Sequence, residues 1–434
     1  MKNTESPVYI DSEIGELEEV IIHTPGQEIE VITPLTAEKL LYNDILPLSA
    51  VKKEYSILHD FLSLVAKTVE VKDVLLTLLD DSTARMNIID SLCTTDVLKS
   101  RKDELSVMSS GELCRILISG FKNRKNTLSS FLSEEEFDYF PLPNLYFTRD
   151  SAMVFRDRFI TGSMAYSVRE PESHLMKQII KKQYRLSDKN LLFDGTKASG
   201  AAGFVSHLQP QERITLEGGD FLVFSSSILI IGLSERTTSQ AVDAVIENLV
   251  PVMNSAFRVY CVLLPKKRET IHLDMVFNII NKNEVLIYEP YITGEAQLKF
   301  IRIDVDIEGG KNIRIIKSLL DDLKESGYPL EPVYCGGNDV RLRQREQWLS
   351  GNNFFAFSPG KIIGYDCNEA TLKALENAGY KILPAEKFIS GGEKTADYNK
   401  LAVTIPGTDL ARGGGGVRCM TLPVRRKHFD MENK

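Results

Sequence analysis

A cysteine follows a run of four glycines in the segment GGGGVRCM, residues 413–420. Glycine runs occur where a chain needs unusual backbone dihedral angles, or where another group must approach the main chain closely. The thiol of Cys419 follows a backbone segment without side chains and is therefore a candidate nucleophile. The alternative is a loose C-terminal tail that carries an incidental cysteine. The segment alone leaves both interpretations open.

Two further segments place carboxylates beside aromatic residues or glycines. PNLYFTRDS contains Phe147 and Asp150, and an aromatic ring beside a carboxylate suits a planar cation. In LEGGDFLVF, Glu217 and Asp220 flank a Gly-Gly pair, which is typical of a bulge or of a close approach to a ligand. Each segment also has a plainer interpretation: a loop in which Asp150 makes a turn, and a hairpin whose acids face solvent.

An imidazole and a carboxylate lie two residues apart in IHLDMVFN, as His272 and Asp274. The apolar residues around them predict a partly buried strand, in which both side chains point to the same face. Such a pair suits proton transfer and the binding of an N–H donor. A surface histidine beside an exposed aspartate is the alternative.

A thiol, a histidine and several acids together favour covalent catalysis by cysteine. Several carboxylates in one pocket repel each other unless a cation binds among them, so the set favours a positively charged substrate. The six cysteines show no CxxC spacing and the sequence contains no HExxH pattern. We therefore expect no disulfide framework and no metal site.

The composition is that of a folded globular protein. The chain has 434 residues, of which 43% are hydrophobic and 26% are charged, and its net charge is −8. The negative charge disfavours a nucleic-acid partner. We find neither a signal-peptide core near the N-terminus nor an uninterrupted apolar run of membrane-spanning length. The expectation is a cytoplasmic enzyme without contact to a membrane.

Three segments show the same local pattern, in which the apolar period changes from two to about 3.6. Residues 151–184 predict two strands around Asp157-Arg158 and a helix from Glu170, and residues 213–250 predict three strands and a helix near Thr237. Such ββαβ-like units can close radially around a shared mouth. An open mixed sheet with helices on its faces is the alternative.

The third segment, residues 354–385, predicts two strands turning at Pro359-Gly360, a helix from about Asn368 and another strand. Residues 73–136 break the pattern, because their apolar spacing predicts helices throughout. We interpret residues 73–136 as a helical subdomain inserted into an α/β body.

The segments FTRD, EGGD, HLD and RCM, in this order, resemble the arginine deiminase family of guanidine-modifying enzymes. The resemblance extends to SEIGELEEVIIHTPGQEIEVITP near the N-terminus and so covers nearly the whole chain. It implies a five-bladed α/β propeller formed by residues 1–72 and 137–434. It also implies that residues 73–136 are the helical insertion of this family.

The resemblance implies hydrolysis of L-arginine to L-citrulline and ammonia through an amidino-cysteine intermediate. Cys419 would attack the guanidinium carbon, and Asp150 and Asp274 would bind the guanidinium nitrogens. His272 would protonate the departing ammonia and then activate a water, assisted by Glu217. The resemblance implies no cofactor and no metal, and the family commonly forms homo-oligomers.

The amino-acid part of the substrate would be bound by a second set of residues, namely Asn144, Phe147, Arg169, Arg236, Gly413 and Arg418. One position departs from the family pattern. Some members carry an arginine that reaches the substrate carboxylate where this sequence has Gly414, with Arg412 and Arg418 nearby. The sequence therefore leaves open which arginine binds the carboxylate.

Two other kinds of function are also compatible with the sequence. Another guanidine-modifying enzyme, such as an amidinotransferase or an agmatine deiminase, would share the thiol chemistry. Agmatine lacks the carboxylate that Arg169 and Arg236 would bind, so the two arginines favour arginine as the substrate. A non-catalytic arginine-binding protein is the rival from a different class, and the complete set of thiol, imidazole and acids argues against it.

Overall fold

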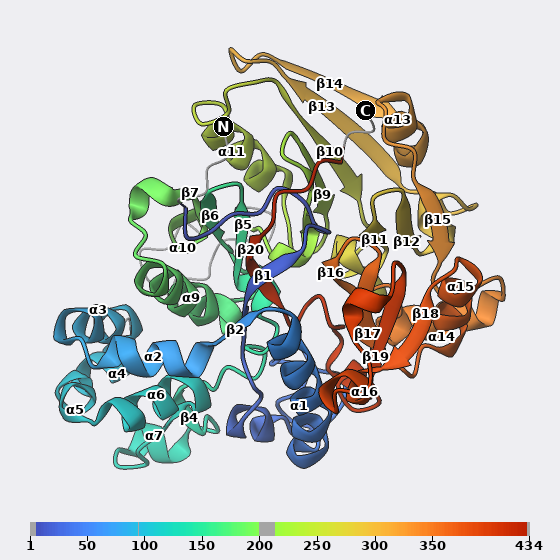
Figure 1. Ribbon diagram of the computed structural model, residues 1–434. Coiled ribbons are helices and arrows are strands. Elements are labelled where there is room, and N and C mark those ends of the chain that lie inside the picture. The colour runs from blue at the N-terminus through green and yellow to red at the C-terminus, as the bar shows by residue number, and fades with distance from the viewer. Residues whose placement is uncertain (1–5, 94, 199–212, 432–434) are drawn as a thin grey trace.

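The fold is a mixed α/β arrangement of several small sheets with helices packed around them (Figure 1). The computed structural model describes residues 6–93, 95–198 and 213–431. Within these residues the strands form one five-stranded, one four-stranded, three three-stranded sheets and one two-stranded sheet. None of the helices in these ranges is long and apolar enough to cross a membrane.

The first predicted ββαβ-like unit is present. Its strands β5 and β6 form an antiparallel hairpin around Arg156 and Asp157, and the helix α9 returns the chain to the parallel strand β7. Leu175, Met176 and Ile179 of α9 are buried at the spacing of one helix face. The elements are β5 (Ala152–Phe155), β6 (Arg158–Thr161), α9 (Glu170–Gln183), β7 (Leu191–Asp194) and the short α10 (Gly195–Ala198).

The second unit has two strands before its helix, so the prediction of three strands there is wrong. Leu216 makes only an isolated bridge with Ser163, because the next residues turn into a 3-10 helix. A hairpin, β13 and β14, extends this sheet at its edge. The elements are β8 (Phe221–Ser225), β9 (Ile228–Leu233), α11 (Ser239–Leu249), β10 (Phe257–Leu263), β13 (Lys299–Val305) and β14 (Lys311–Ile316).

The third unit also contains the predicted hairpin, helix and strand, but its sheet has an additional member. Strand β19 lies between β17 and β18 and is parallel to both. The helix α15 follows Asn368, as predicted. The elements are β16 (Phe355–Ser358), β17 (Lys361–Tyr365), α15 (Glu369–Asn377), β18 (Lys381–Pro384), α16 (Ala385–Ile389) and β19 (Leu401–Ile405).

Another three-stranded sheet, in the order β11-β12-β15, combines an antiparallel and a parallel pair. Its elements and the adjacent helices are β11 (Phe277–Asn281), β12 (Glu284–Ile287), α12 (Glu289–Ile292), α13 (Leu319–Glu325), β15 (Glu331–Tyr334) and α14 (Val340–Trp348).

The last three-stranded sheet joins the two ends of the chain. Strand β20 (Leu422–Arg426) runs antiparallel to β1 (Leu17–Ile22), and β1 runs parallel to β2 (Lys67–Glu70). Figure 1 shows the blue strand β1 beside the red strand β20, with helix α1 (Leu48–Val65) near them. Because Cys419 precedes β20 directly, this pairing fixes the position of the thiol.

Residues 71–139 form a group of short helices beside the body of the molecule, at the lower left of Figure 1. The prediction of helix throughout 73–136 is wrong at Phe121, because Gly120, with φ of +86°, ends α6 and a short two-stranded sheet follows. The elements are α2 (Val71–Leu79), α3 (Ser82–Leu92), α4 (Asp96–Ser100), α5 (Lys102–Val107), α6 (Ser110–Ser119), β3 (Phe121–Lys122), α7 (Leu128–Leu132) and β4 (Phe137–Tyr139).

Candidate active site

A cavity of about 500 Å³ contains most of the residues that the sequence indicated. Its walls come from the glycine loop, from the segment before β5 and from loops that follow β6, β9 and β10. The predicted site residues that line it are Asn144, Phe147, Asp150, Arg169, Arg236, His272, Gly413 and Cys419. Glu217, Asp274 and Arg418 do not line the cavity; Glu217 and Asp274 contact residues that do.

The thiol of Cys419 is fixed inside the protein, so the interpretation as a loose tail is wrong. The residue is 2% exposed. Its backbone N–H donates to Asn353 Oδ1 at 3.0 Å, and its carbonyl accepts from the Arg149 N–H at 3.1 Å. The sulfur lies 3.8 Å from Asp274 Oδ2. A thiol, a carboxylate and the wall of a cavity are therefore in contact.

The glycine loop packs against aromatic rings. A Cβ atom on Gly415 would lie 2.5 Å from the ring of Phe147, so only glycine fits at this position. Gly414 has φ of +88°, a left-handed conformation that side chains strongly disfavour. The loop therefore uses its glycines for close packing and for one left-handed turn.

The prediction that His272 and Asp274 occupy a strand is wrong. Leu273–Met275 form one turn of 3-10 helix, and β11 begins only at Phe277. The side chain of Asp220 stabilises this turn, since its Oδ1 accepts from the Leu273 N–H at 2.9 Å. Both predicted side chains still reach the site, since Asp274 Oδ2 lies 3.8 Å from the sulfur of Cys419 and His272 lines the same cavity as Cys419.

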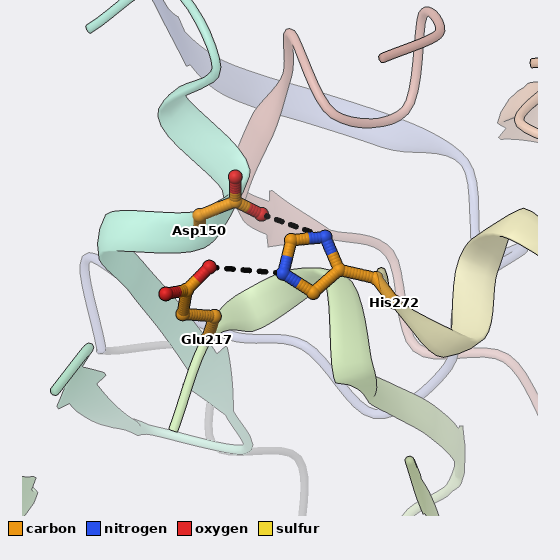
Figure 2. Close-up of side chains that lie close together, drawn as sticks. All are labelled: Asp150, Glu217 and His272. Carbon is orange, nitrogen blue, oxygen red and sulfur yellow. Dashed lines mark hydrogen bonds and ion pairs between the residues drawn. The ribbon is translucent and has the colours of Figure 1, made fainter. Parts of the chain in front are cut away.

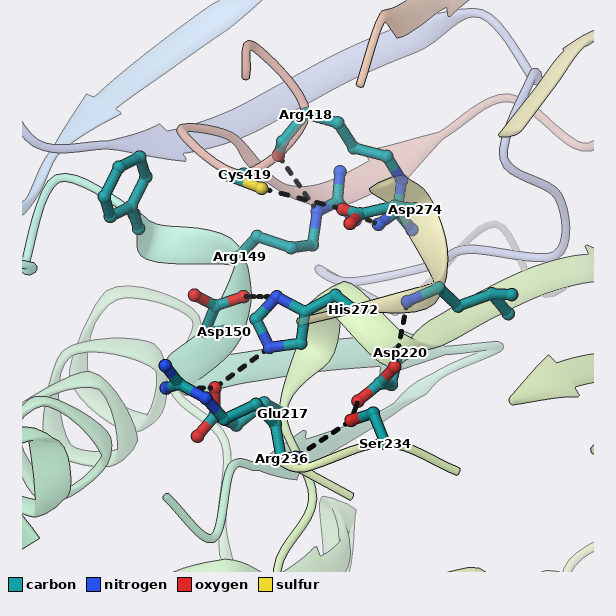
Figure 3. A network of polar contacts seen from close by, with 12 residues as sticks. Arg149, Asp150, Glu217, Asp220, Ser234, Arg236, His272, Asp274, Arg418 and Cys419 are labelled. Atoms are coloured by element: carbon teal, nitrogen blue, oxygen red, sulfur yellow. Dashed lines mark hydrogen bonds and ion pairs between the residues drawn. The ribbon is translucent and has the colours of Figure 1, made fainter. Parts of the chain in front are cut away.

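Asp220 is a residue whose role the sequence did not reveal. It is fully buried, and its Oδ2 accepts from the Ser234 hydroxyl at 2.6 Å (Figure 3). Burial raises the pKa of this carboxyl to about 7, although the charge of His272 and the hydrogen bond from Ser234 act in the opposite direction. The EGGD motif marked Asp220, but only the fold shows that it positions the turn that carries His272.

His272 lies between two carboxylates, as Figure 2 shows. Its Nε2 is 3.0 Å from Glu217 Oε2, and its Nδ1 is 3.7 Å from Asp150 Oδ1. The glycine pair of EGGD permits this contact, since a Cβ atom on Gly219 would lie 2.5 Å from the imidazole ring. The close approach that the glycines indicated is therefore made by the side chain of His272.

The protonation of the site follows from these contacts. Burial alone would lower the pKa of His272, but Asp150, Cys419 and Glu217 raise it well above its ordinary value. Burial opposes ionisation of Glu217, yet Arg236 and His272 lower its pKa to about 2. Hence, at neutral pH, the imidazole carries a positive charge and Glu217 is ionised.

The thiol of Cys419 is neutral under the same conditions. Burial raises its pKa to about 11, with a further contribution from Asp274, while the hydrogen bond with His272 lowers it. The site therefore holds a protonated thiol beside a protonated imidazole.

Asp150, Glu217 and His272 each offer one ligand atom, and these atoms lie within 4.8 Å of one another. Such a group resembles a metal site in its composition. However, Arg169 Nη1 lies 2.8 Å from Asp150 Oδ2, and Arg236 Nη1 lies 3.5 Å from Glu217 Oε2. Two guanidinium groups and the imidazolium already balance the two acids, so the electrostatics do not favour a divalent cation here.

Arg169 is occupied by carboxylates. Besides Asp150 it contacts Glu172 at 2.8 Å and Glu217 at 3.8 Å. Its guanidinium therefore orders the acids of the cavity wall.

Arg236 stacks over Tyr166 at 4.6 Å, and its Nε atom is buried without a hydrogen-bond partner in the described part of the chain.

Arg418 lies behind the cavity instead of in its wall. Its Nη1 is 2.8 Å from Asp274 Oδ2 (Figure 3). Its Nη2 is 3.0 Å from Glu13 Oε1. The side chain is almost fully buried. The geometry thus makes Arg418 the partner of Asp274, whereas the resemblance had suggested a contact with the substrate.

Two carboxylate oxygens close to the sulfur are free to accept hydrogen bonds. Asp150 Oδ1 and Asp274 Oδ1 are buried and have no hydrogen-bond partner among the described residues. A buried acceptor without a partner is costly, so each oxygen favours a donor. A planar cation with several N–H groups would supply donors for both oxygens.

Comparison with known proteins gives matches over nearly the whole chain. A family model described as arginine deiminase matches residues 38–426. Arginine deiminase of Listeria monocytogenes serotype 4b is 32% identical over 449 residues, covering 98% of this chain and 99% of that protein. Arginine deiminase of Oenococcus oeni is 29% identical over 450 residues, covering 99% and 100%.

Solved structures share the fold at lower sequence identity. An amidinotransferase of saxitoxin biosynthesis from Microseira wollei aligns with a TM-score of 0.55 and 15% identity, covering 98% of both chains. Identity at this level supports a common architecture of small sheets and helices, and nothing finer.

Proposed function

The chain belongs to the arginine deiminase family, and from this premise we propose that it hydrolyses L-arginine to L-citrulline and ammonia. It is a hydrolase that acts on a guanidino C–N bond. The observation that carries the proposal is the position of the Cys419 sulfur, 3.8 Å from Asp274 and in the same cavity as Asp150 and His272. These are the groups that a guanidinium and its reaction require.

Binding comes first in the proposed mechanism. The substrate guanidinium donates hydrogen bonds to Asp150 Oδ1 and Asp274 Oδ1, two buried oxygens that accept no hydrogen bond from the described residues. A cation placed next to the sulfur lowers the pKa of Cys419, so the thiol releases its proton to solvent and the resulting thiolate attacks the guanidinium carbon. The result is a tetrahedral carbon bonded to sulfur.

His272 then transfers a proton to the departing amine. Its Nε2 is held by Glu217, so Nδ1, which faces Asp150, is the nitrogen that exchanges protons with the reacting groups. Loss of ammonia leaves an amidino-thioether on Cys419. The imidazole, now neutral, takes a proton from a water that attacks this intermediate, and citrulline and the free thiol result.

The wider architecture is part of the proposal. The five sheets of three or more strands correspond to the five blades of an α/β propeller, with residues 73–136 as an inserted helical subdomain. The ββαβ-like order in three of these sheets supports this assignment. Formation of a homo-oligomer and a cytoplasmic location remain predictions from the sequence.

The direct test is incubation of the purified protein with L-arginine. We expect citrulline and ammonia in equal amounts, and neither product from the Cys419→Ala variant, whose circular dichroism should match that of the wild type. Ornithine formed only with an added amine acceptor would indicate an amidinotransferase instead. Citrulline production by Cys419→Ala would contradict the assignment of the nucleophile.

A further inference from the structure

Arg268 lines the same cavity as Cys419 and has no role in the mechanism above. It begins the 3-10 turn Arg268–Thr270, which follows β10 and precedes the turn of His272. Its guanidinium stacks over the ring of Trp348 at 4.7 Å. One nitrogen, Nη1, is buried without a hydrogen-bond partner in the part of the chain that the structure describes.

The other cations of this cavity face carboxylates. Arg169 pairs with Asp150 and Glu172, Arg236 lies 3.5 Å from Glu217, and Lys39 pairs with Glu135 at 2.8 Å. Within the described ranges, no carboxylate lies within 4.0 Å of the Arg268 guanidinium. Burial lowers the pKa of Arg268, and only the more distant Asp44 acts in the opposite direction. Arg268 therefore brings an unbalanced positive charge to the cavity.

The glycine loop leaves room for this guanidinium. A Cβ atom on Gly414 would lie 3.2 Å from Arg268 Nη2 and 3.9 Å from its Cζ. Arg268 therefore occupies the space that a side chain at position 414 would enter. The guanidinium lies beside the backbone of the loop whose far end carries the sulfur.

We propose that Arg268 binds the α-carboxylate of the substrate and so selects arginine over guanidines that lack this group. The inference rests on the proposed function, since it assigns the second end of the same substrate. An arginine can bind a carboxylate through two parallel hydrogen bonds, and partial burial strengthens such a pair. Stacking on Trp348 holds the guanidinium plane in place before the substrate arrives.

The test measures binding without turnover. In the Cys419→Ala background, the affinities for L-arginine and for agmatine are measured by calorimetry with and without Arg268→Ala. Since a charge-assisted hydrogen bond contributes about 1.5–3 kcal/mol, we expect arginine to bind about 10- to 150-fold more weakly. The affinity for agmatine should change by less than about threefold, because agmatine offers no carboxylate. Arg268→Lys should restore part of the preference, as lysine keeps the charge but loses the planar fork.

Arg412 provides a matched control, because it lies in the same region but is half-exposed and paired with Asp44 and Asp409. Arg412→Ala should leave the ratio of the two affinities unchanged. An equal loss of arginine and agmatine binding in Arg268→Ala would make Arg268 a structural residue and overturn the inference. Unchanged arginine binding would overturn it as well. If arginine binds as expected but the wild type forms no citrulline, the proposed function fails and the assignment of Arg268 stands.

Discussion

Cys419 and His272 do not form a preformed thiolate–imidazolium pair. Burial and Asp274 raise the pKa of the thiol to about 11, while Asp150 and Glu217 keep the imidazole protonated despite its burial. The proposed nucleophile is therefore expected to become reactive only when a positive charge enters the site. A reactive thiol that stays protonated without substrate is also protected from alkylation and oxidation.

Alkylation of Cys419 should reveal this dependence on the substrate charge. Without a ligand, the rate of reaction with iodoacetamide should rise with a midpoint near the thiol pKa of about 11. A non-reacting cationic analogue that leaves the sulfur accessible should lower this midpoint by about 1–3 pH units, since an opposite charge favours the thiolate. Cys419→Ala supplies the background from the other cysteines. A low midpoint that the analogue does not change would contradict the model.

Through its side-chain contacts, His23 connects the elements that lead into one wall of the cavity. It follows β1, and its Nε2 lies 3.2 Å from Glu28 in the turn Gln27–Val31. Its Nδ1 lies 3.4 Å from Glu70 at the end of β2. Burial opposes protonation, but the hydrogen bonds and charges of Glu28 and Glu70 raise the pKa of His23 to about 9.

The stability of the protein should therefore depend on pH through His23. Because the folded pKa is higher than the ordinary value, the stabilisation is complete below about pH 6.5 and disappears as the pH rises through about 9. Its size is on the order of 3 kcal/mol. In urea unfolding, His23→Gln should lose much more stability at pH 6 than at pH 9.5. The exposed His59, beside Asp60, gives the control variant His59→Gln, which should change little. An equal loss for His23→Gln at both pH values would rule out this role.

At the scale of the whole molecule, the site depends on contacts between distant parts of the chain. Arg418 joins Glu13, near the N-terminus, to Asp274, and β20 pairs with β1 immediately beyond. Burial would raise the pKa of Glu13, but the charges of Arg418 and Arg149 lower it to about 2. The group of buried charges behind the cavity therefore orients Asp274 and also holds the ends of the chain together.

Removal of the Arg418 guanidinium should destabilise the whole protein. Arg418→Met leaves Glu13 and Asp274 buried without their cation, which costs about 3–5 kcal/mol in the free energy of unfolding. The half-exposed pair of Arg425 and Glu18 offers a matched comparison, and Arg425→Met should change stability by less than about 1 kcal/mol. If Arg418→Met unfolded like the wild type and lost only affinity for arginine, Arg418 would be a substrate ligand, as the sequence suggested.

The sequence predicts local features well in this protein. The hairpins, the helices after Arg169 and Asn368, and the residues of the four motifs depend on nearby chemistry and on apolar periods. Prediction from the sequence failed where tertiary contacts decide the conformation. The turn of His272 is held by Asp220, which lies in the 3-10 turn Gly218–Asp220 before β8. The loss of alternation in Leu273, Met275 and Val276 was its only local sign. Nothing in the local sequence indicates that β19 lies between β17 and β18. Nothing there indicates either that Arg268 has no carboxylate partner among the described residues.

The contact between Glu13 and Arg418 closes a loop of 405 residues. The entropy lost on closing a loop increases with its length, and contacts between distant residues tend to form late during folding. We therefore expect the loop that carries Cys419 to become ordered after most helices and strands have formed. After denaturation, activity should return later than the helical circular dichroism signal.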